Sequence, residues 1–226
     1  MYVLAADTTT PAGSVALLEN EKLLAEFNSE AGLKHSEKLL PAVDFLLHKF
    51  DLKARDIDGF AIAVGPGSFT GIRVGLSTFK SLAYASSKPV APIATLNALA
   101  WKLRLPQARL LCPVMDAKKG EVYAALFESR GSQIAEIVTQ GAYKPDQFFS
   151  LLPARRVISF IGTGTDIYRE KILKYFGDKS RFPRRSLFIA HEVGILGYKL
   201  LKQGRGKNFL DIEPIYLRRS QAEDNL

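Results

Sequence analysis

Short apolar runs alternate with turn signals along the first 28 residues of the chain. Three of these runs, Tyr2–Ala6, Ser14–Leu18 and Leu23–Phe27, have the length and the side chains of β-strands. The segments between them, residues 8–13 and 19–21, contain the Pro, Gly and Asn that are typical of turns. The pattern predicts an antiparallel meander.

A helical period follows. Apolar residues recur three or four positions apart, at Leu39, Val43, Leu46 and Phe50. This spacing places them on one face of a helix over about residues 36–50. Ser36 is suited to the N-cap of this helix. Pro41 is tolerable only because it lies near the helix start, where few backbone donors need partners.

A wholly apolar run, Gly59–Val64, has the pattern of a strand that is buried on both faces. It runs into a glycine-rich loop at residues 65–71. After the loop we expect a helix over about residues 72–86, a strand near Val90–Ala94 and a helix near Leu96–Leu103. Strand, loop, helix and strand in this order predict a βαβ unit.

The second half of the chain repeats the opening of the first. We expect strands at Leu110–Met115, Glu121–Phe127 and Gln133–Val138. Residues 7–19 align without gaps on residues 116–128, and four of the thirteen positions are identical. Chance similarity is the alternative, but the matched hydropathy and strand order favour a duplication with an offset of 109 residues.

The rest of the second half alternates helices and strands. A helix is expected near Pro145–Leu152, with Pro145 at its first position and Asp146 at its positive end. A strand at Val157–Ile161 then leads to Gly162-Thr163-Gly164 and to helices near residues 166–176 and 191–203, the last closed by Gly204. We therefore expect an α/β fold with two mixed-sheet lobes, residues 1–105 and 106–226. We allow for the last helix packing back on the first lobe.

Composition and charge narrow the class of protein. The chain has 226 residues, of which 47% are hydrophobic, which is enough to bury a substantial core. Its single cysteine, Cys112, lies in an apolar stretch and is expected in the core, so an intramolecular disulfide and a cysteine-based zinc site are excluded. The absence of a basic leader and of a membrane-length apolar run predicts a soluble, cytoplasmic protein.

The net charge of +8 is uneven. Residues 1–113 hold 12 basic and 10 acidic side chains, whereas residues 114–226 hold 19 and 13. A basic second half is compatible with an acidic partner such as RNA, and equally with a merely solvated surface.

The glycine loop and two aspartates are the candidate binding features. The loop reads Gly-Pro-Gly-Ser-Phe-Thr-Gly, which is neither a P-loop nor a dinucleotide fingerprint. Backbone N–H groups at the start of the following helix could hold an anion, or the glycines could relieve a tight strand-to-helix turn. Asp7 and Asp116 could hold a hydrated Mg²⁺ beside a phosphate, or each could close its hairpin as an Asx-turn. At Asp116 the following Ala-Lys-Lys favours the turn.

No catalytic set emerges from the titratable residues. The three histidines, His35, His48 and His191, are not spaced as metal ligands. His35 could contact a ligand or partner, and His48 is expected on a solvated helix face. No Ser-His-Asp or Cys-His arrangement can be assembled.

Taken together, the motifs resemble the TsaB (YeaZ) family, which takes part in bacterial threonylcarbamoyladenosine (t6A) synthesis on tRNA. The resemblance covers most of the chain and is densest over residues 2–128. The segments that carry it are Leu4–Thr9, His35–Pro41, Gly65–Gly75, Asp116–Tyr123 and Pro214–Arg218.

The resemblance implies a duplicated fold of the actin, Hsp70 and sugar-kinase type. It implies a non-catalytic paralogue of the catalytic subunit TsaD, without a cofactor of its own. Such a subunit would pair with TsaD and the ATPase TsaE in a complex that uses ATP and Mg²⁺. The complex would transfer threonylcarbamoyl from its adenylate to adenosine 37 of ANN-decoding tRNAs, so that tRNA is a partner through the complex.

Departures from the catalytic pattern support a non-catalytic role. TsaD-like proteins carry a His-x-x-x-His pair where this chain has Thr95 and Leu99, which cannot replace imidazole ligands. We therefore expect no bound metal. A vestigial nucleotide or phosphate site would be formed by Asp7, Thr8, Gly65, Gly67, Ser68, Asp116, Gly162 and Gly164.

The resemblance also places a TsaD-binding surface on the helices at about residues 36–50 and 72–86, and the same surface could form a homodimer. The residues expected there are His35, Leu39, Val43, Leu46, Ile72, Arg73, Leu76 and Phe79, although for the apolar ones the sequence does not separate interface from core. Two other functions stay open: a small-molecule kinase or ATPase of the same fold, and direct tRNA binding by the basic second half.

Overall fold

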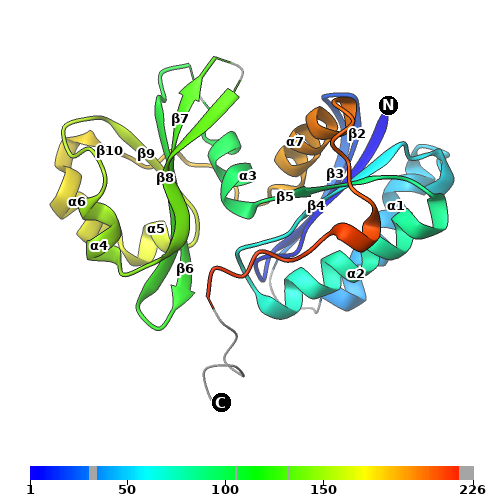
Figure 1. Ribbon diagram of the computed structural model, residues 1–226, viewed down its shortest axis with the longest axis horizontal. Helices are drawn as coiled ribbons and strands as arrows, with labels where there is room; N and C mark the ends of the chain where they lie inside the picture. The colour runs from blue at the N-terminus through cyan, green and yellow to red at the C-terminus, as the bar shows by residue number, and fades with distance from the viewer. Residues whose placement is uncertain (31–34, 105, 132, 219–226) are drawn as a thin grey trace. The chain divides into compact units, whose positions relative to one another are not determined.

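The computed structural model describes residues 1–30, 35–104, 106–131 and 133–218 (Figure 1). The chain forms two compact units. Unit 1 combines Met1–Ala98 with Phe188–Tyr216, and unit 2 consists of Leu99–Leu187 with Leu217 and Arg218. The first boundary lies at residues 98–99 rather than after residue 105, and a segment near the C-terminus returns to unit 1, as was allowed for its last helix.

Unit 1 is built on a five-stranded sheet of order β3-β2-β1-β4-β5. Strands β1 (Tyr2–Asp7), β2 (Gly13–Glu19) and β3 (Lys22–Ser29) form the predicted antiparallel meander. Strands β4 (Gly59–Ala63) and β5 (Val90–Ile93) continue the sheet in parallel beyond β1. All five residues of β4 are buried, as its wholly apolar sequence predicts.

Helices cover both faces of this sheet (Figure 1). One face packs against α1 (His35–Lys49) and α2 (Phe69–Ser86), and the other against α7 (Ala190–Lys202). Successive side chains along each strand point to opposite faces of the sheet, and the two faces differ in side-chain size. The larger residues Leu4, Phe60 and Ile62 face α1 and α2. Small residues on the other face let α7 approach closely, and a Cβ at Gly197 would overlap the Ala61 side chain.

Unit 2 repeats the same strand order. Its sheet runs β10-β9-β6-β7-β8, with a meander of β6 (Leu110–Lys118), β7 (Glu121–Arg130) and β8 (Gln133–Tyr143). Strands β9 (Ile158–Ile161) and β10 (Ser180–Arg181) extend it in parallel beyond β6. The shared order supports the duplication predicted from residues 7–19 and 116–128.

The gapless alignment is not kept residue by residue. In the first hairpin Asp7 pairs with Ser14, whereas in the second Asp116 pairs with Val122, one residue earlier than the offset of 109 requires. A register irregularity between Asp116 and Lys118 takes up the difference.

The core of unit 2 is aromatic. Helices α4 (Pro145–Ser150), α5 (Gly164–Ile167) and α6 (Arg169–Phe176) accompany its sheet. Phe149 lies edge-on to Phe176 at a centroid distance of 6.2 Å, and Phe160 lies 5.6 Å from Phe176. Pro145 occupies the start of α4, as predicted. Cys112 is buried as predicted, and burial raises its pKa well above the usual value.

Several local predictions were wrong in detail. Helix α2 begins at Phe69 rather than near residue 72, and the helix expected at residues 166–176 is divided into α5 and α6. Ser36 lies inside α1 and is not its N-cap. Strand β10 and three short 3-10 helices, Ala54–Asp56, Gly177–Lys179 and Phe209–Asp211, were not anticipated. Helix α3 (Thr95–Lys102) and the Gly204 closure of α7 agree with the prediction.

The burial of Phe79 at the centre of α2 leads to a stability prediction. Its ring is fully buried and meets Phe60 edge-on at 6.0 Å. Phe79→Ala should reduce the free energy of unfolding by about 3–5 kcal/mol, because it leaves a cavity. Tyr84→Ala on the same helix, where the side chain is 69% exposed, should cost less than about 1 kcal/mol. Urea denaturation checks both values, and equal losses would contradict the assigned core.

Candidate functional site

The turn after β1 is closed by its aspartate. Asp7 is 1% exposed, and its Oδ1 accepts hydrogen bonds from the backbone N–H of Thr9 at 2.9 Å and from Thr9 Oγ1 at 2.7 Å. This is an Asx-turn supplemented by a hydroxyl. The second oxygen, Oδ2, is buried without a protein hydrogen-bond partner.

Burial determines the protonation behaviour of Asp7. Desolvation raises the pKa of its carboxyl above the ordinary value, and the bonds from Thr9 and the proximity of His35 only partly offset it. Because the pKa is higher in the folded state than in the unfolded state, Asp7 contributes less stability as the pH rises through the interval between the two values. At neutral pH, the buried carboxylate oxygen without a hydrogen-bond partner therefore lowers the free energy of unfolding.

The glycine loop packs directly on this turn. A Cβ at Gly67 would overlap the carbonyl oxygen of Thr9, and a Cβ at Gly71 would overlap the carbonyl oxygen of Thr8. A Cβ at Gly75, one turn further along α2, would overlap Thr8 Oγ1, which donates a hydrogen bond to the Gly71 carbonyl at 2.8 Å. The glycines are thus needed for close approach of the chain to itself. This geometry favours the steric explanation over an anion site.

Two amides near the start of α2 are hydrogen-bonded within the chain. The Ser68 N–H donates to the Thr9 carbonyl at 2.7 Å, and the Gly71 N–H donates to Ser68 Oγ at 3.2 Å. Ser68 is therefore the N-cap of α2. Gly65 has a φ of +111° and lies against the carbonyl oxygen of Ile215, whose N–H binds the Val64 carbonyl.

Little space is left beside Asp7. A cavity of about 20 Å³, lined by Asp7, Thr8, His35 and Lys38 among others, holds about one water molecule. His35 Nε2 donates to the carbonyl of Thr10 at 2.7 Å, so it braces the turn. A nucleotide does not fit in this space.

The second turn repeats the first in a simpler form. Asp116 Oδ1 accepts from the Lys118 N–H at 3.0 Å, and Oδ2 pairs with Lys118 Nζ at 2.7 Å. The turn closed by Asp116 is thus equivalent to the turn closed by Asp7. This geometry agrees with the prediction that Asp116 closes its hairpin as an Asx-turn. Cβ atoms at Gly162 and Gly164 would crowd Val114, so these two glycines also serve close packing.

The positions of the absent histidine pair are both buried. Thr95 is fully buried at the start of α3, and Leu99 is 3% exposed one turn later. Within the described residues, no group of three or more His, Cys, Asp or Glu side chains could hold a metal ion. In the same part of the chain, no helix has the length and apolarity to cross a membrane.

The predicted partner residues are mostly in the core. Six of them are at most 6% exposed and contribute to the unit 1 core: Leu39, Val43, Leu46, Ile72, Leu76 and Phe79. They cannot form a docking surface in this conformation. His35 is half-buried and lies against the turn after β1. Of the predicted set, only Arg73 is exposed.

A largely different set of residues forms the exposed surface of α1 and α2. A groove of about 600 Å³ is lined by Leu40, Pro41 and Leu47 of α1, by residues 52–54 and by Leu82 of α2, with Asp44 and His48 also at its wall. Leu40 is 54% exposed. Val43 of the predicted set also lines this groove, but it is 2% exposed. Sequence periodicity missed the exposed residue Leu40 because it lies outside the apolar stripe.

Small hydroxyl residues follow the outer face of α2. Ser77 and Ser81 are exposed, and their hydroxyls donate to the carbonyls of Val74 and Ser77 within the helix, at 3.1 and 2.9 Å. Near the start of α2, the Arg73 guanidinium lies 3.7 Å from the Phe69 ring centroid and donates to Tyr216 Oη at 3.1 Å. The hydroxyls of Ser77 and Ser81 already have hydrogen-bond acceptors within the helix. A partner protein that covered this face would therefore leave few polar groups without a hydrogen bond.

Comparisons with known proteins agree with one another. The family model "TsaD: tRNA N6-adenosine threonylcarbamoyltransferase" matches residues 29–226. The TsaB proteins of Bacillus subtilis and Haemophilus influenzae are 29% and 33% identical, over 99% and 96% of this chain and 96% and 94% of their own. Both are described as tRNA threonylcarbamoyladenosine biosynthesis proteins.

Solved structures lead to the same group. YeaZ from Pseudomonas aeruginosa is 28% identical, covers 96% of this chain and 99% of its own, and superposes with a TM-score of 0.80. A ROK hexokinase from Thermus thermophilus has a TM-score of 0.54 at 13% identity, covering 89% of this chain and all of its own, which shows the fold alone. The predicted duplicated actin-like fold with two mixed sheets is confirmed.

The close packing of the glycine loop on the turn after β1 predicts how glycine substitutions affect stability. Gly71→Ala should lower the free energy of unfolding by about 1–3 kcal/mol, because the added methyl group must displace the Thr8 carbonyl. Gly131→Ala, where no atom lies within 4 Å of the added Cβ, should cost only the roughly 1–2 kcal/mol of its positive φ.

Chemical denaturation gives the two energies, and near-ultraviolet circular dichroism reports local repacking. The loop variant should also change the near-ultraviolet spectrum, whereas the control should not. A Gly71→Ala protein with wild-type stability and spectrum would show that the loop is not in close contact with the turn.

Proposed function

Since the chain belongs to the TsaB family of tRNA threonylcarbamoyladenosine biosynthesis proteins, we propose that it is a non-catalytic subunit of a cytoplasmic tRNA-modifying complex. In this proposal it binds and supports a TsaD-type transferase, together with the ATPase TsaE. The complex transfers threonylcarbamoyl from its adenylate to adenosine 37 of ANN-decoding tRNAs. The reacting groups, and the ATP and Mg²⁺ that the complex uses, are held by the partners.

The observation that carries the non-catalytic role is the closed glycine loop. Thr8 and Thr9 lie against Gly67 and Gly71, and the cavity beside Asp7 has room for about one water molecule. This packing supports a chain that keeps the actin-like framework without binding a nucleotide. The buried Thr95 and Leu99 support a chain without the metal pair of TsaD-like proteins.

A small-molecule kinase or ATPase is the less favoured alternative. It would need room for a nucleotide beside the glycine loop, whereas the cavity beside Asp7 has room for about one water molecule. The hexokinase likeness extends to the fold and not to the sequence.

We place the partner-binding surface on the exposed side of α1 and α2. The groove there is mostly apolar, and Leu40 at its wall is more than half exposed. A helix of TsaD laid into this groove would bury Leu40 and Leu82 and cover the outer face of α2. Burying such an apolar patch is a main source of affinity between proteins. The same surface would pair with a second copy of this chain in a homodimer, in competition with TsaD.

Reconstitution tests the proposed function. With TsaD, TsaE, the enzyme that makes threonylcarbamoyl adenylate and an ANN-decoding tRNA, t6A should form only when this chain is present. Mass spectrometry of the digested tRNA measures the product. Equal t6A yield without the chain would refute the proposed function, and so would failure of the chain to bind TsaD.

A single charge should identify the docking surface. Leu40→Glu should weaken binding to TsaD at least tenfold and reduce t6A yield in parallel, because the complex would bury an unpaired carboxylate. Leu151→Glu is the matched control, since Leu151 is 53% exposed but lies in unit 2. Titration calorimetry measures the affinities, and thermal melts should show both variants folded. Equal affinities for the two variants would place the surface elsewhere.

A further inference from the structure

The charge of unit 2 is concentrated in one stretch. Residues 169–185 hold seven basic and two acidic side chains, a net charge of +5 within 17 residues of a chain whose total is +8. The stretch comprises α6, the 3-10 turn Gly177–Lys179, strand β10 and the segment that leads to Phe188. It is the local source of the basic character of the second half.

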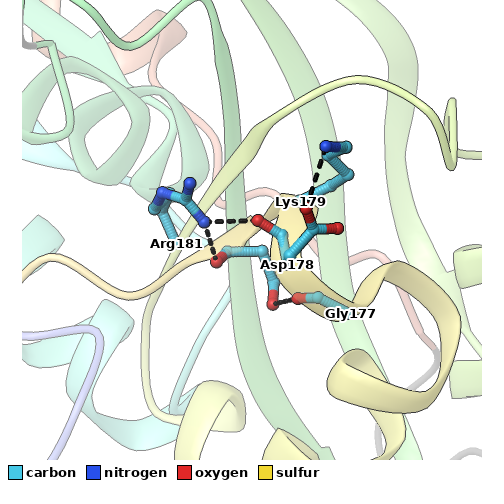
Figure 2. Close-up of polar contacts among 5 residues, drawn as sticks. Gly177, Asp178, Lys179 and Arg181 are labelled. Atoms are coloured by element: carbon cyan, nitrogen blue, oxygen red, sulfur yellow. Dashed lines mark hydrogen bonds and ion pairs between the residues drawn. The ribbon is translucent and has the colours of Figure 1, made fainter.

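The turn before β10 holds one arginine in a defined position. Arg181 Nη1 donates to the carbonyls of Asp178 at 2.5 Å and of Ser180 at 3.0 Å (Figure 2). Ser180 Oγ binds the Gly177 carbonyl at 2.7 Å, which closes the turn. The Arg181 side chain is hydrogen-bonded to neutral carbonyls while the residue stays exposed, and it forms no ion pair with a described carboxylate. Together with the larger effect of Lys179, its charge nevertheless helps to lower the pKa of Asp178.

The next two basic residues have no acidic partner. Arg184 and Arg185 are exposed, and neither forms an ion pair with any described residue. They follow Phe182-Pro183, in which the Phe182 ring stacks on Phe160 at 5.8 Å. The Arg169 guanidinium lies 4.1 Å from the Phe182 ring centroid. The segment that carries both arginines is therefore anchored on the aromatic core of unit 2.

The remaining charges of the stretch are partly neutralised. Lys179 pairs with Asp178 at 3.0 Å (Figure 2), and Lys171 pairs with Asp146 of α4 at 2.7 Å. Glu170 is the other carboxylate of the stretch and is exposed on α6. Arg181, Arg184 and Arg185 thus lie within five residues of one another in sequence, and none of the three forms an ion pair with a carboxylate in the described part of the chain.

We propose that Arg181, Arg184 and Arg185 contact the phosphate backbone of the tRNA in the complex. The inference rests on the proposed function and adds a surface to it. Guanidinium groups suit phosphates because they present forked donors and keep their charge. Arginines on an exposed edge strand can also serve merely to prevent edge pairing, but β10 has only two residues, and Arg184 and Arg185 lie beyond it.

Binding of tRNA by the reconstituted complex tests the proposal. The variant R184Q/R185Q spares Arg181, whose hydrogen bonds hold the turn. It should weaken tRNA binding by roughly tenfold at physiological salt. The plot of log Kd against log salt concentration should be shallower by about 2, one for each lost phosphate contact. R184K/R185K keeps the charge and should retain most of the salt dependence.

A matched control removes two charges elsewhere. Lys22 and Lys207 are exposed in unit 1 and form no side-chain ion pair with a described residue. K22Q/K207Q should leave both the affinity and the salt dependence within twofold of the wild type. Thermal melts and TsaD binding verify that every variant is folded and assembled.

The outcomes separate the two proposals. If the wild-type chain supports t6A formation but R184Q/R185Q binds tRNA with unchanged affinity and salt dependence, the arginine surface is refuted and the proposed function stands. If the wild-type chain is not needed for t6A formation, both the proposed function and the arginine surface are refuted. Loss of binding to phosphatidylglycerol vesicles with unchanged tRNA binding would assign the cluster to a membrane and refute the RNA contact. Aggregation of R184Q/R185Q with unchanged tRNA binding would leave edge protection as its role.

Discussion

The packing of α2 on the turn after β1 is the contact on which the rest of unit 1 depends. Gly67, Gly71 and Gly75 let the helix lie against Thr8 and Thr9 with almost no space between backbones. This contact fixes the start of α2: the N-cap residue Ser68 donates its N–H to the Thr9 carbonyl and accepts from the Gly71 N–H. It thereby positions the large apolar side chains of α2 over one face of the sheet.

The same contact decides what kind of chemistry unit 1 can support. In a fold that includes sugar kinases, a glycine-rich loop beside an aspartate suggests a phosphate site. Here the chain itself fills the space, and Asp7 is buried with its own turn as its hydrogen-bond partner. Among the described residues, a groove between α1 and α2 and an arginine cluster in unit 2 are exposed. Both are consistent with the proposed role as a subunit that binds other macromolecules.

The regular framework could be read from the sequence. Alternation and apolar runs located all strands but β10, and the recurrence of Asp7 and Asp116 revealed the repeat. Two-residue β10 carries no periodic signal, and its pairing depends on a distant strand. The return of α7 to unit 1 was allowed for, but the exact division of the chain lay beyond sequence reasoning, because it depends on contacts such as that of Gly197 with Ala61, which are far apart in the chain.

The candidate site was predicted less well, for a physical reason. Helical periodicity selects the apolar stripe, and in an amphipathic helix that stripe faces the core, so Leu39, Val43 and Phe79 were assigned to a surface although they are buried. The surface residue Leu40 lies outside the stripe. The role of the glycine loop likewise could not be decided, because a sequence does not show which atoms face a glycine.

Titration calorimetry of the isolated chain with ATP and Mg²⁺ tests whether the glycine loop is closed to nucleotides. With Thr8 and Thr9 packed against the loop, no binding heat is expected up to millimolar ATP. The Leu40→Glu variant should behave identically, because its substitution is remote from that loop. A dissociation constant in the micromolar range, with turnover of ATP by the chain alone, would contradict the closed site and restore the kinase-like alternative.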